Sequence, residues 1–116
     1  MRSESLAFLR TLLDTPSPSG FERDGQRVWL DYVRASGATR TWNDAYGNCF
    51  AELVPTVPAA GSARPFTVAI CGHADEIGVM VNHVDSNGFV WCRAIGGIDA
   101  GSIVASGCNS ARPCPG

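Results

Sequence analysis

A histidine and two carboxylates stand where an apolar run ends, in the segment ICGHADEIGVMV at residues 70–81. A neutral imidazole is a common zinc ligand, which makes His73 the candidate metal ligand. Asp75 lies two residues further on and shares a face with His73 in extended backbone. Its carboxylate can then accept the ring N–H that points away from a metal, and so orient the imidazole. Nothing in the local sequence assigns a role to Glu76.

The chemistry of these residues alone leaves metal binding open. A zinc site needs three or four ligands, and a lone histidine after a strand is often an ordinary hydrogen-bonded surface group. Cys71 is a second candidate ligand, but a pair flanking one glycine usually needs a matching pair elsewhere in the sequence. The other histidine, His83, falls in the middle of an expected strand, where we expect a half-buried structural side chain.

Two helices are expected before this segment. The first carries leucines at helical spacing and ends at TPSPSG, because prolines cannot continue its hydrogen bonding. Ser19 precedes Glu22 by three residues, the spacing of a capping box, and so predicts the start of a second helix that ends at Gly37. The apolar stripes of the two helices are expected to be Leu6, Leu9, Leu12 and Leu13, and then Val28, Trp29, Tyr32 and Val33.

Strands are expected from residue 39 onward. The segments TRTWN and CFAELV alternate in polarity around the turn DAYGN, and GVMVNHVD and FVWCRAI flank the hairpin signal SNG. Between these pairs, FTVAIC at residues 66–71 is typical of a central strand covered on both faces. The order of elements favours an α/β layered architecture, in which ligands bind beyond the carboxyl ends of the strands. Too few helices are present to cover both faces of the strand at residues 66–71, so we expect the N-terminal part of a larger fold.

Composition excludes several classes of function. The chain has 116 residues, a formal net charge of −2 and 17% charged residues, so we expect no nucleic-acid partner. No apolar run is long enough to span a membrane, and Glu4 and Arg10 interrupt what would be the core of a signal peptide. We therefore expect a cytoplasmic protein whose five cysteines, including Cys108 and Cys114, are free thiols.

The motifs GHADEIGVMV, GFVWCRAIGGID, LLDTPSPSGFE and DAYGN occur in this order along the chain. Together they resemble the tetrahedral-aminopeptidase family of two-metal metallopeptidases, relatives of glutamyl aminopeptidase and deblocking aminopeptidase. The likeness covers Leu6 to Asp99. Related zinc exopeptidases also carry His-x-Asp, but they lack the Asp-Glu-Ile-Gly run and the later Gly-Gly-x-Asp.

The resemblance implies a fold, a reaction and roles for two residues. Residues 1–100 would be the N-terminal part of a zinc-exopeptidase-like layered α/β catalytic domain, and residues 101–116 an irregular tail where the family's inserted β-rich domain begins. His73 corresponds to the first ligand of a site for two divalent metal ions, zinc or cobalt, and Asp75 to the residue that orients it. The family removes N-terminal residues from peptides and forms large homo-oligomers.

The family's other metal ligands and its general-base glutamate lie downstream of the matched motifs. At most one metal ligand is therefore expected in this chain, which we expect to be inactive in this truncated form. Family likeness is lost after Asp99, which suggests a reading-frame shift or a truncated gene. Two alternatives remain open: a non-catalytic interaction or assembly module, and an endoglucanase, a label that some family members have carried. The adjacent Asp75 and Glu76 do not suit the opposed carboxylates of a glycosidase.

Overall fold

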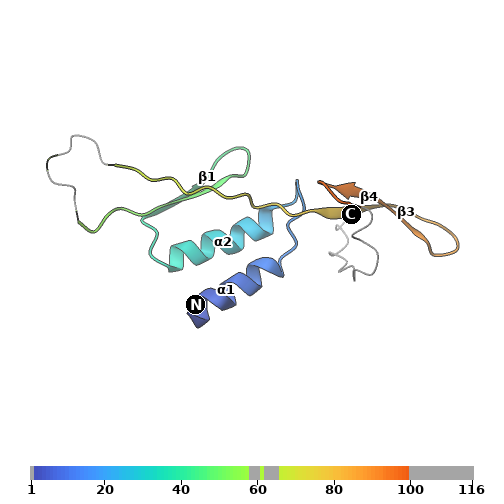
Figure 1. Ribbon diagram of the computed structural model, residues 1–116, viewed down its shortest axis with the longest axis horizontal. Coiled ribbons are helices and arrows are strands. Elements are labelled where there is room, and N and C mark those ends of the chain that lie inside the picture. The colour runs from blue at the N-terminus through green and yellow to red at the C-terminus, as the bar shows by residue number, and fades with distance from the viewer. Residues whose placement is uncertain (1, 58–60, 62–65, 100–116) are drawn as a thin grey trace.

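Two helices are followed by two β-hairpins in the computed structural model, which describes residues 2–57, 61 and 66–99 (Figure 1). Both sheets are antiparallel and two-stranded, so the expectation of a mixed α/β chain is confirmed at this level. The predicted tail at residues 101–116, with Cys108 and Cys114, lies outside the described residues. The elements are α1 (Ser3–Leu13), α2 (Arg23–Ala35), β1 (Arg40–Asn43), β2 (Cys49–Glu52), β3 (Gly78–Val84) and β4 (Val90–Ile95).

The two helices lie side by side and meet through one aromatic pair (Figure 1). The rings of Phe8 and Tyr32 stack with centroids 3.7 Å apart, and the Ser5 and Tyr32 hydroxyls are 3.3 Å apart. The predicted leucine stripe of α1 is only partly correct, because the packed face is the one that carries Phe8. Leu13 is 70% exposed on the other side of the helix.

The C-terminus of α2 ends as the sequence predicts, whereas the N-terminus of α2 does not begin as predicted. At the C-terminus, Gly37 has a φ of +94°, and the Ala38 N–H donates to the Val33 carbonyl at 3.0 Å. This is the glycine-terminated end that the sequence predicts. At the N-terminus the predicted capping box is wrong. Glu22 occupies the cap position without a side-chain cap bond, and the Ser19 hydroxyl contacts Asp75 instead.

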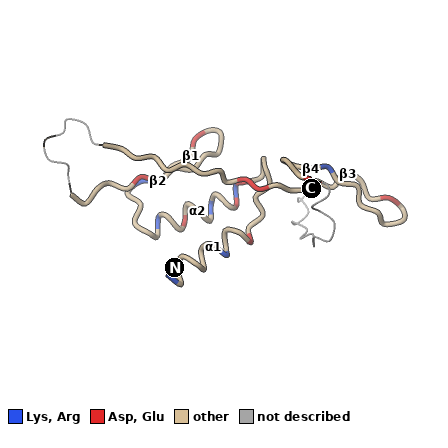
Figure 2. The backbone as a smooth tube through the Cα atoms, viewed as in Figure 1, with Lys and Arg blue, Asp and Glu red and all other residues tan. Residues whose placement is uncertain are grey.

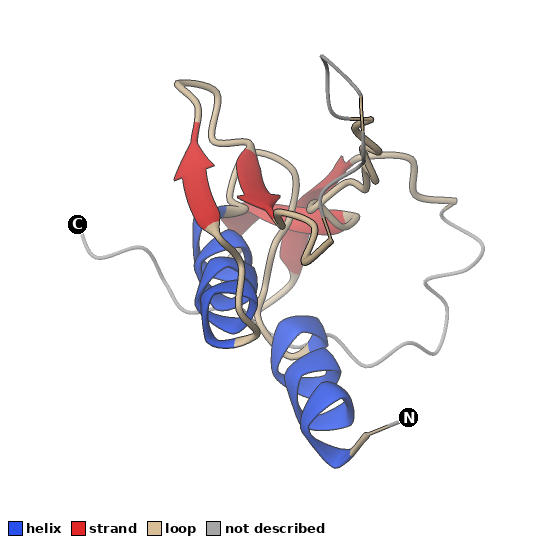
Figure 3. Ribbon diagram, turned by 90° about the vertical axis from the view of Figure 1, so that its left-hand side faces the viewer, coloured by secondary structure: helices blue, strands red, loops and turns tan. Residues whose placement is uncertain are grey.

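The first hairpin pairs Arg40 with Glu52 through Asn43 with Cys49, as its alternating pattern predicts. Its strands lie over α2, and Figure 3 shows them on one side of the helix pair. Trp42 and Phe50 stack across the two strands with ring centroids 5.1 Å apart. Cross-strand aromatic pairs of this kind stabilise a sheet by up to about 1 kcal/mol.

The second hairpin is also confirmed, with a β-bulge between Val81 and His83. Within the described residues, β3 and β4 contact no other helix or strand, and the hairpin projects away from the helices (Figure 1). Its side chains are accordingly exposed. The expectation that His83 is half-buried is therefore wrong, because no described helix or strand packs on either face of β3.

The predicted central strand at residues 66–71 is not present. This segment is extended but unpaired, and Phe66, Val68 and Ile70 are 88%, 69% and 97% exposed. An apolar run becomes a central strand only when neighbouring strands accept its backbone hydrogen bonds. None of the described strands is hydrogen-bonded to it.

The described part of the chain is elongated and has a small core. Its radius of gyration is 19.4 Å, whereas a compact domain of this length has about 13 Å. Leu30, outside the predicted stripe of α2, is the buried large hydrophobic residue of this part. Acidic and basic residues are interspersed along the described backbone (Figure 2). In these same ranges no helix has the length and apolar character to cross a membrane.

Candidate functional site

The loop at residues 16–20 holds the segment that carries the candidate site residues. Pro18 and Glu76 form an isolated parallel β-bridge. The Glu76 N–H donates to the Ser17 carbonyl at 2.8 Å, and the Ser19 N–H donates to the Glu76 carbonyl at 3.3 Å. These bonds fix residues 74–76 against the turn that joins α1 to α2. The loop and this segment are together called the serine-loop clamp below.

Side chains reinforce the serine-loop clamp from both directions. The Ser17 hydroxyl donates to the Ala74 carbonyl at 2.8 Å, and Ser17 is 7% exposed. The Glu76 carboxylate accepts the Ser17 N–H at 2.9 Å. Glu76, which the sequence left without a role, therefore has a structural one here, because it caps a backbone donor of the loop.

Two glycines permit the close approach within the serine-loop clamp. A Cβ at Gly25 of α2 would lie 3.1 Å from the Ser17 hydroxyl oxygen. A Cβ at Gly78, the first residue of β3, would lie 3.1 Å from the Pro18 Cβ. Larger residues at either position would push the loop away. The clamp is thus packed between the start of α2 and the start of β3.

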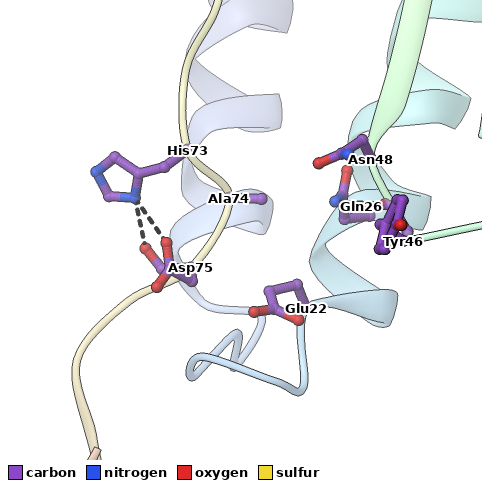
Figure 4. Close-up of a pocket in the computed structure, with 8 residues that line it drawn as sticks. Glu22, Gln26, Tyr46, Asn48, His73, Ala74 and Asp75 are labelled. Atoms are coloured by element: carbon purple, nitrogen blue, oxygen red, sulfur yellow. Dashed lines mark hydrogen bonds and ion pairs between the residues drawn. The ribbon is translucent and has the colours of Figure 1, made fainter. Parts of the chain in front are cut away.

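His73 and Asp75 lie on the same side of this extended segment and contact one another. His73 Nδ1 is 3.0 Å from Asp75 Oδ1 and 2.8 Å from the Asp75 carbonyl oxygen. Figure 4 shows both contacts, with Ala74 on the opposite side of the backbone. Since a carbonyl oxygen only accepts, Nδ1 must carry a proton to bond it, and the neutral ring then has its lone pair on Nε2.

The other carboxylate oxygen of Asp75 is bound by the serine loop. The Ser19 hydroxyl donates to Asp75 Oδ2 at 2.5 Å. The pKa of the Asp75 carboxyl is lowered, mainly because this hydroxyl bonds the charged form; the His73 ring adds to the effect and desolvation opposes it. Asp75 is thus ionised at neutral pH and accepts on both oxygens.

A shallow cavity of about 220 Å³ lies beside the pair, between the segment at residues 73–75, the start of α2 and the β1–β2 turn. Ala74 faces Gln26 and Asn48 across it, whereas the His73 ring points away from them (Figure 4). The lining is mostly polar and includes Glu22, Gln26, Tyr46, Asn48, His73 and Asp75. Its polar lining suits a polar ligand group rather than an apolar side chain.

Few potential metal ligands lie around His73 in the described part of the chain. Among the described residues, no group of three or more His, Cys, Asp and Glu side chains lies close enough to hold a metal ion. Cys71 and Cys92 are exposed free thiols, and Cys49 is a partly covered free thiol. His73 fits the role of a single ligand, because its Nε2 lone pair is exposed and its other nitrogen is held. Its metal-binding role stays a prediction, as does the orienting role of Asp75.

Two residues of this arrangement were missed by sequence reasoning. Ser17 and Ser19 bond the segment at residues 74–76 from more than fifty positions away in the chain. The sequence signal was the PSPSG loop itself, which was interpreted only as a helix stop followed by a cap. Two serines at i, i+2 spacing share a face in extended backbone, so this loop also suits a tertiary hydrogen-bonding role.

Comparison with known proteins points to one family. The family model of M42 glutamyl aminopeptidase matches residues 56–111 of the chain. The expectation that family likeness is lost after Asp99 is therefore wrong, because the match continues to residue 111. Lysyl aminopeptidase of Pyrococcus furiosus is 28% identical over 97 residues, an alignment that covers 84% of this chain and 26% of the relative. The chain thus spans about a quarter of the length of this curated relative. No solved structure matches the chain.

Proposed function

We propose that the chain belongs to the M42 glutamyl aminopeptidase family, as its motifs predict, and that it is the N-terminal part of a metal-dependent aminopeptidase. Its α/β elements would form one side of a zinc-exopeptidase-like layered catalytic domain. The observation that carries the proposal is the His73–Asp75 contact, which leaves one imidazole nitrogen exposed for a metal. The substrates would be peptides with a free N-terminus, and the complete enzyme would act as a cytoplasmic homo-oligomer.

His73 and Asp75 have distinct roles in this proposal. When bound, zinc or cobalt ions supply an activated water and a polarised scissile carbonyl. His73 would donate its Nε2 lone pair to one of these ions. Asp75 would hold the proton on Nδ1 and make the ring a stronger donor. The described residues bring no further ligand to His73, so we expect no appreciable peptide hydrolysis by the chain alone.

A chimera tests the proposal directly. The aligned 97-residue segment of the Pyrococcus furiosus relative would be replaced by the matching segment of this chain, and aminoacyl-nitroanilide hydrolysis measured with metal supplied. We expect an active chimera. His73→Ala should lower kcat/KM by more than about 100-fold, and Asp75→Ala by about 10- to 100-fold, the range typical of residues that orient a metal ligand.

The second histidine provides the matched control. His83→Ala should leave the chimera's kcat/KM within about twofold, since His83 takes no part in the hydrogen bonds that orient His73 and Asp75. Full activity in the His73→Ala chimera contradicts the proposal. A folded but inactive parent chimera would favour a non-catalytic assembly module, for which the exposed apolar segment at residues 66–71 is the supporting observation.

A further inference from the structure

Among the described residues, Asp75 supplies the contacts that orient the His73 ring. The imidazole is 86% exposed, so packing does not hold it in place. Its two contacts within the described residues are the carbonyl oxygen and one carboxylate oxygen of Asp75, both at Nδ1. Whatever fixes Asp75 therefore also decides which ring nitrogen carries the proton.

The Asp75 carboxylate is itself 41% exposed and would rotate freely without a second partner. That partner is the Ser19 hydroxyl on Oδ2, which leaves Oδ1 directed at the imidazole. Ser19 is in turn positioned by its backbone N–H, which donates to the Glu76 carbonyl. Ser19, Asp75 and His73 thus form a chain of hydrogen bonds that starts in the serine loop and ends at the exposed imidazole.

We propose that Ser19 is a positioning residue for His73: its hydroxyl fixes the Asp75 carboxylate so that the ring keeps its proton on Nδ1 and its lone pair on Nε2. The use of that lone pair as a metal donor rests on the proposed function. The positioning itself is a property of this chain without metal or substrate. The two ideas therefore fail separately.

Nitrogen NMR of the two imidazole rings tests the proposal on the full chain in metal-free buffer. The spectra are recorded at a pH of about 8.5, and the ¹⁵N shifts of a neutral imidazole report its tautomer. We expect the Nδ1–H form to predominate at His73. Ser19→Ala should shift the ratio of the two tautomers toward Nε2–H by at least about threefold, the size expected for the loss of one ordinary hydrogen bond.

Three further samples make the result specific. Ser19→Thr keeps the hydroxyl and should restore the parent ratio, and Ser86→Ala, in the exposed β3–β4 turn, should leave it unchanged. His83 is the internal reference, because its tautomer ratio should not respond to Ser19. If Ser19→Ala loses its helical circular dichroism, Ser19→Cys keeps the volume, offers only a weak donor and should shift the ratio in the same direction.

Several outcomes overturn the proposal. A predominant Nε2–H form at His73 in the parent chain does so before any variant is made. An unchanged ratio in a folded Ser19→Ala or Ser19→Cys variant does so as well, because the Asp75 carbonyl would then suffice. An equal change in the tautomer ratio of His83 would mean that the substitution loosens the whole structure rather than the His73 ring. None of these results bears on the chimera, which tests the aminopeptidase proposal independently.

Discussion

Asp44 and Asp85 perform the same local task in the two hairpin turns. The Oδ1 atom of each accepts two backbone N–H groups, from the residues two and four positions further along. Asp44 has one partner more, since the Asn48 side-chain amide donates to its Oδ2 at 2.7 Å. The pKa of Asp44 is lowered, chiefly by that amide and further by the backbone donors, against an opposing effect of desolvation.

Asn48→Ala should raise the pKa of Asp44 toward the ordinary value of 3.8, because it removes the strongest donor to the charged form. A depressed pKa in the folded state stabilises the turn above pH 3.8, and this stabilisation is lost as pH falls through the folded-state value. The variant turn should thus lose its order at a higher pH during acidification. Carboxyl ¹³C titration of Asp44, with the Tyr46 amide shift as a reporter of the turn, measures both.

Asn87→Ala is the matched control for this titration. Asn87 occupies the second turn and contributes only its backbone N–H to Asp85. The change should leave the Asp44 titration where it is. An Asp44 pKa that does not respond to Asn48→Ala would mean that the backbone donors alone account for the lowered value.

At the scale of elements, local patterns predicted most of the structure. Both helices, both hairpins and the Gly37 helix end depend on periodicity and turn residues, which act over a few positions. The prediction of a strand at residues 66–71 was wrong, because a strand needs hydrogen-bonded neighbouring strands that a local sequence pattern does not reveal. The prediction that Ser19 caps α2 was wrong for a similar reason, because its hydroxyl bonds the Asp75 carboxylate, which is distant in the sequence.

In the candidate site, too, some residues were predicted from local spacing and others were not. His73 and Asp75 were both found from their i, i+2 spacing, and the structure brings their side chains into contact. Ser17 and Ser19 were not found, because their partners are fifty-seven and fifty-six positions away, respectively. Spacing within one segment is visible in a sequence, whereas the contact between two segments depends on how the chain folds back.

Ser17→Ala should loosen the contact between the serine loop and residues 74–76. The variant loses the hydrogen bond to the Ala74 carbonyl, which contributes about 1 kcal/mol, or roughly a fivefold change in the opening equilibrium. The backbone N–H of Glu76, which bonds the Ser17 carbonyl, should exchange with solvent about fivefold faster. Hydrogen-exchange NMR of this amide provides the measurement, and Ser86→Ala should leave the rate unchanged.

Gly25→Ala probes the same contact from the helix side. Alanine favours a helix over glycine by about 1 kcal/mol, but its Cβ would meet the Ser17 hydroxyl. We expect faster Glu76 exchange in this variant, and a smaller effect of Gly25→Ala when Ser17 is already alanine. Equal effects in both backgrounds would argue that the two positions do not interact.

At the scale of the whole molecule, apolar residues are abundant but mostly uncovered in the described part. Hydrophobic residues make up 45% of the sequence, which predicts a core. Among the described residues, however, Leu30 is the one large apolar side chain that is buried. The helices meet through Phe8 and Tyr32, and the second hairpin contacts neither helix. Stability should therefore concentrate at α2, where α1 and the first hairpin converge.

Leu30→Ala should abolish the cooperative thermal unfolding of the helix pair. Removing a buried leucine costs about 2–5 kcal/mol, which approaches the whole stability of a small domain. Thermal melting followed by far-ultraviolet circular dichroism is the measurement. Leu13→Ala, at a position 70% exposed, is the matched control and should shift the midpoint by only a few degrees. A cooperative melt that survives Leu30→Ala would place the stabilising contacts elsewhere.

The separation of the two halves of the serine-loop clamp also has a consequence for biosynthesis. Ser17 leaves the ribosome 57 residues before Ala74, whose carbonyl its hydroxyl bonds. At 5–20 residues per second, the nascent loop waits roughly 3 to 11 seconds for that partner. Helices and hairpins form within microseconds, so α1, α2 and the first hairpin can assemble around a loop whose polar groups are still hydrated. The His73 segment then docks as a late addition to a scaffold that already exists.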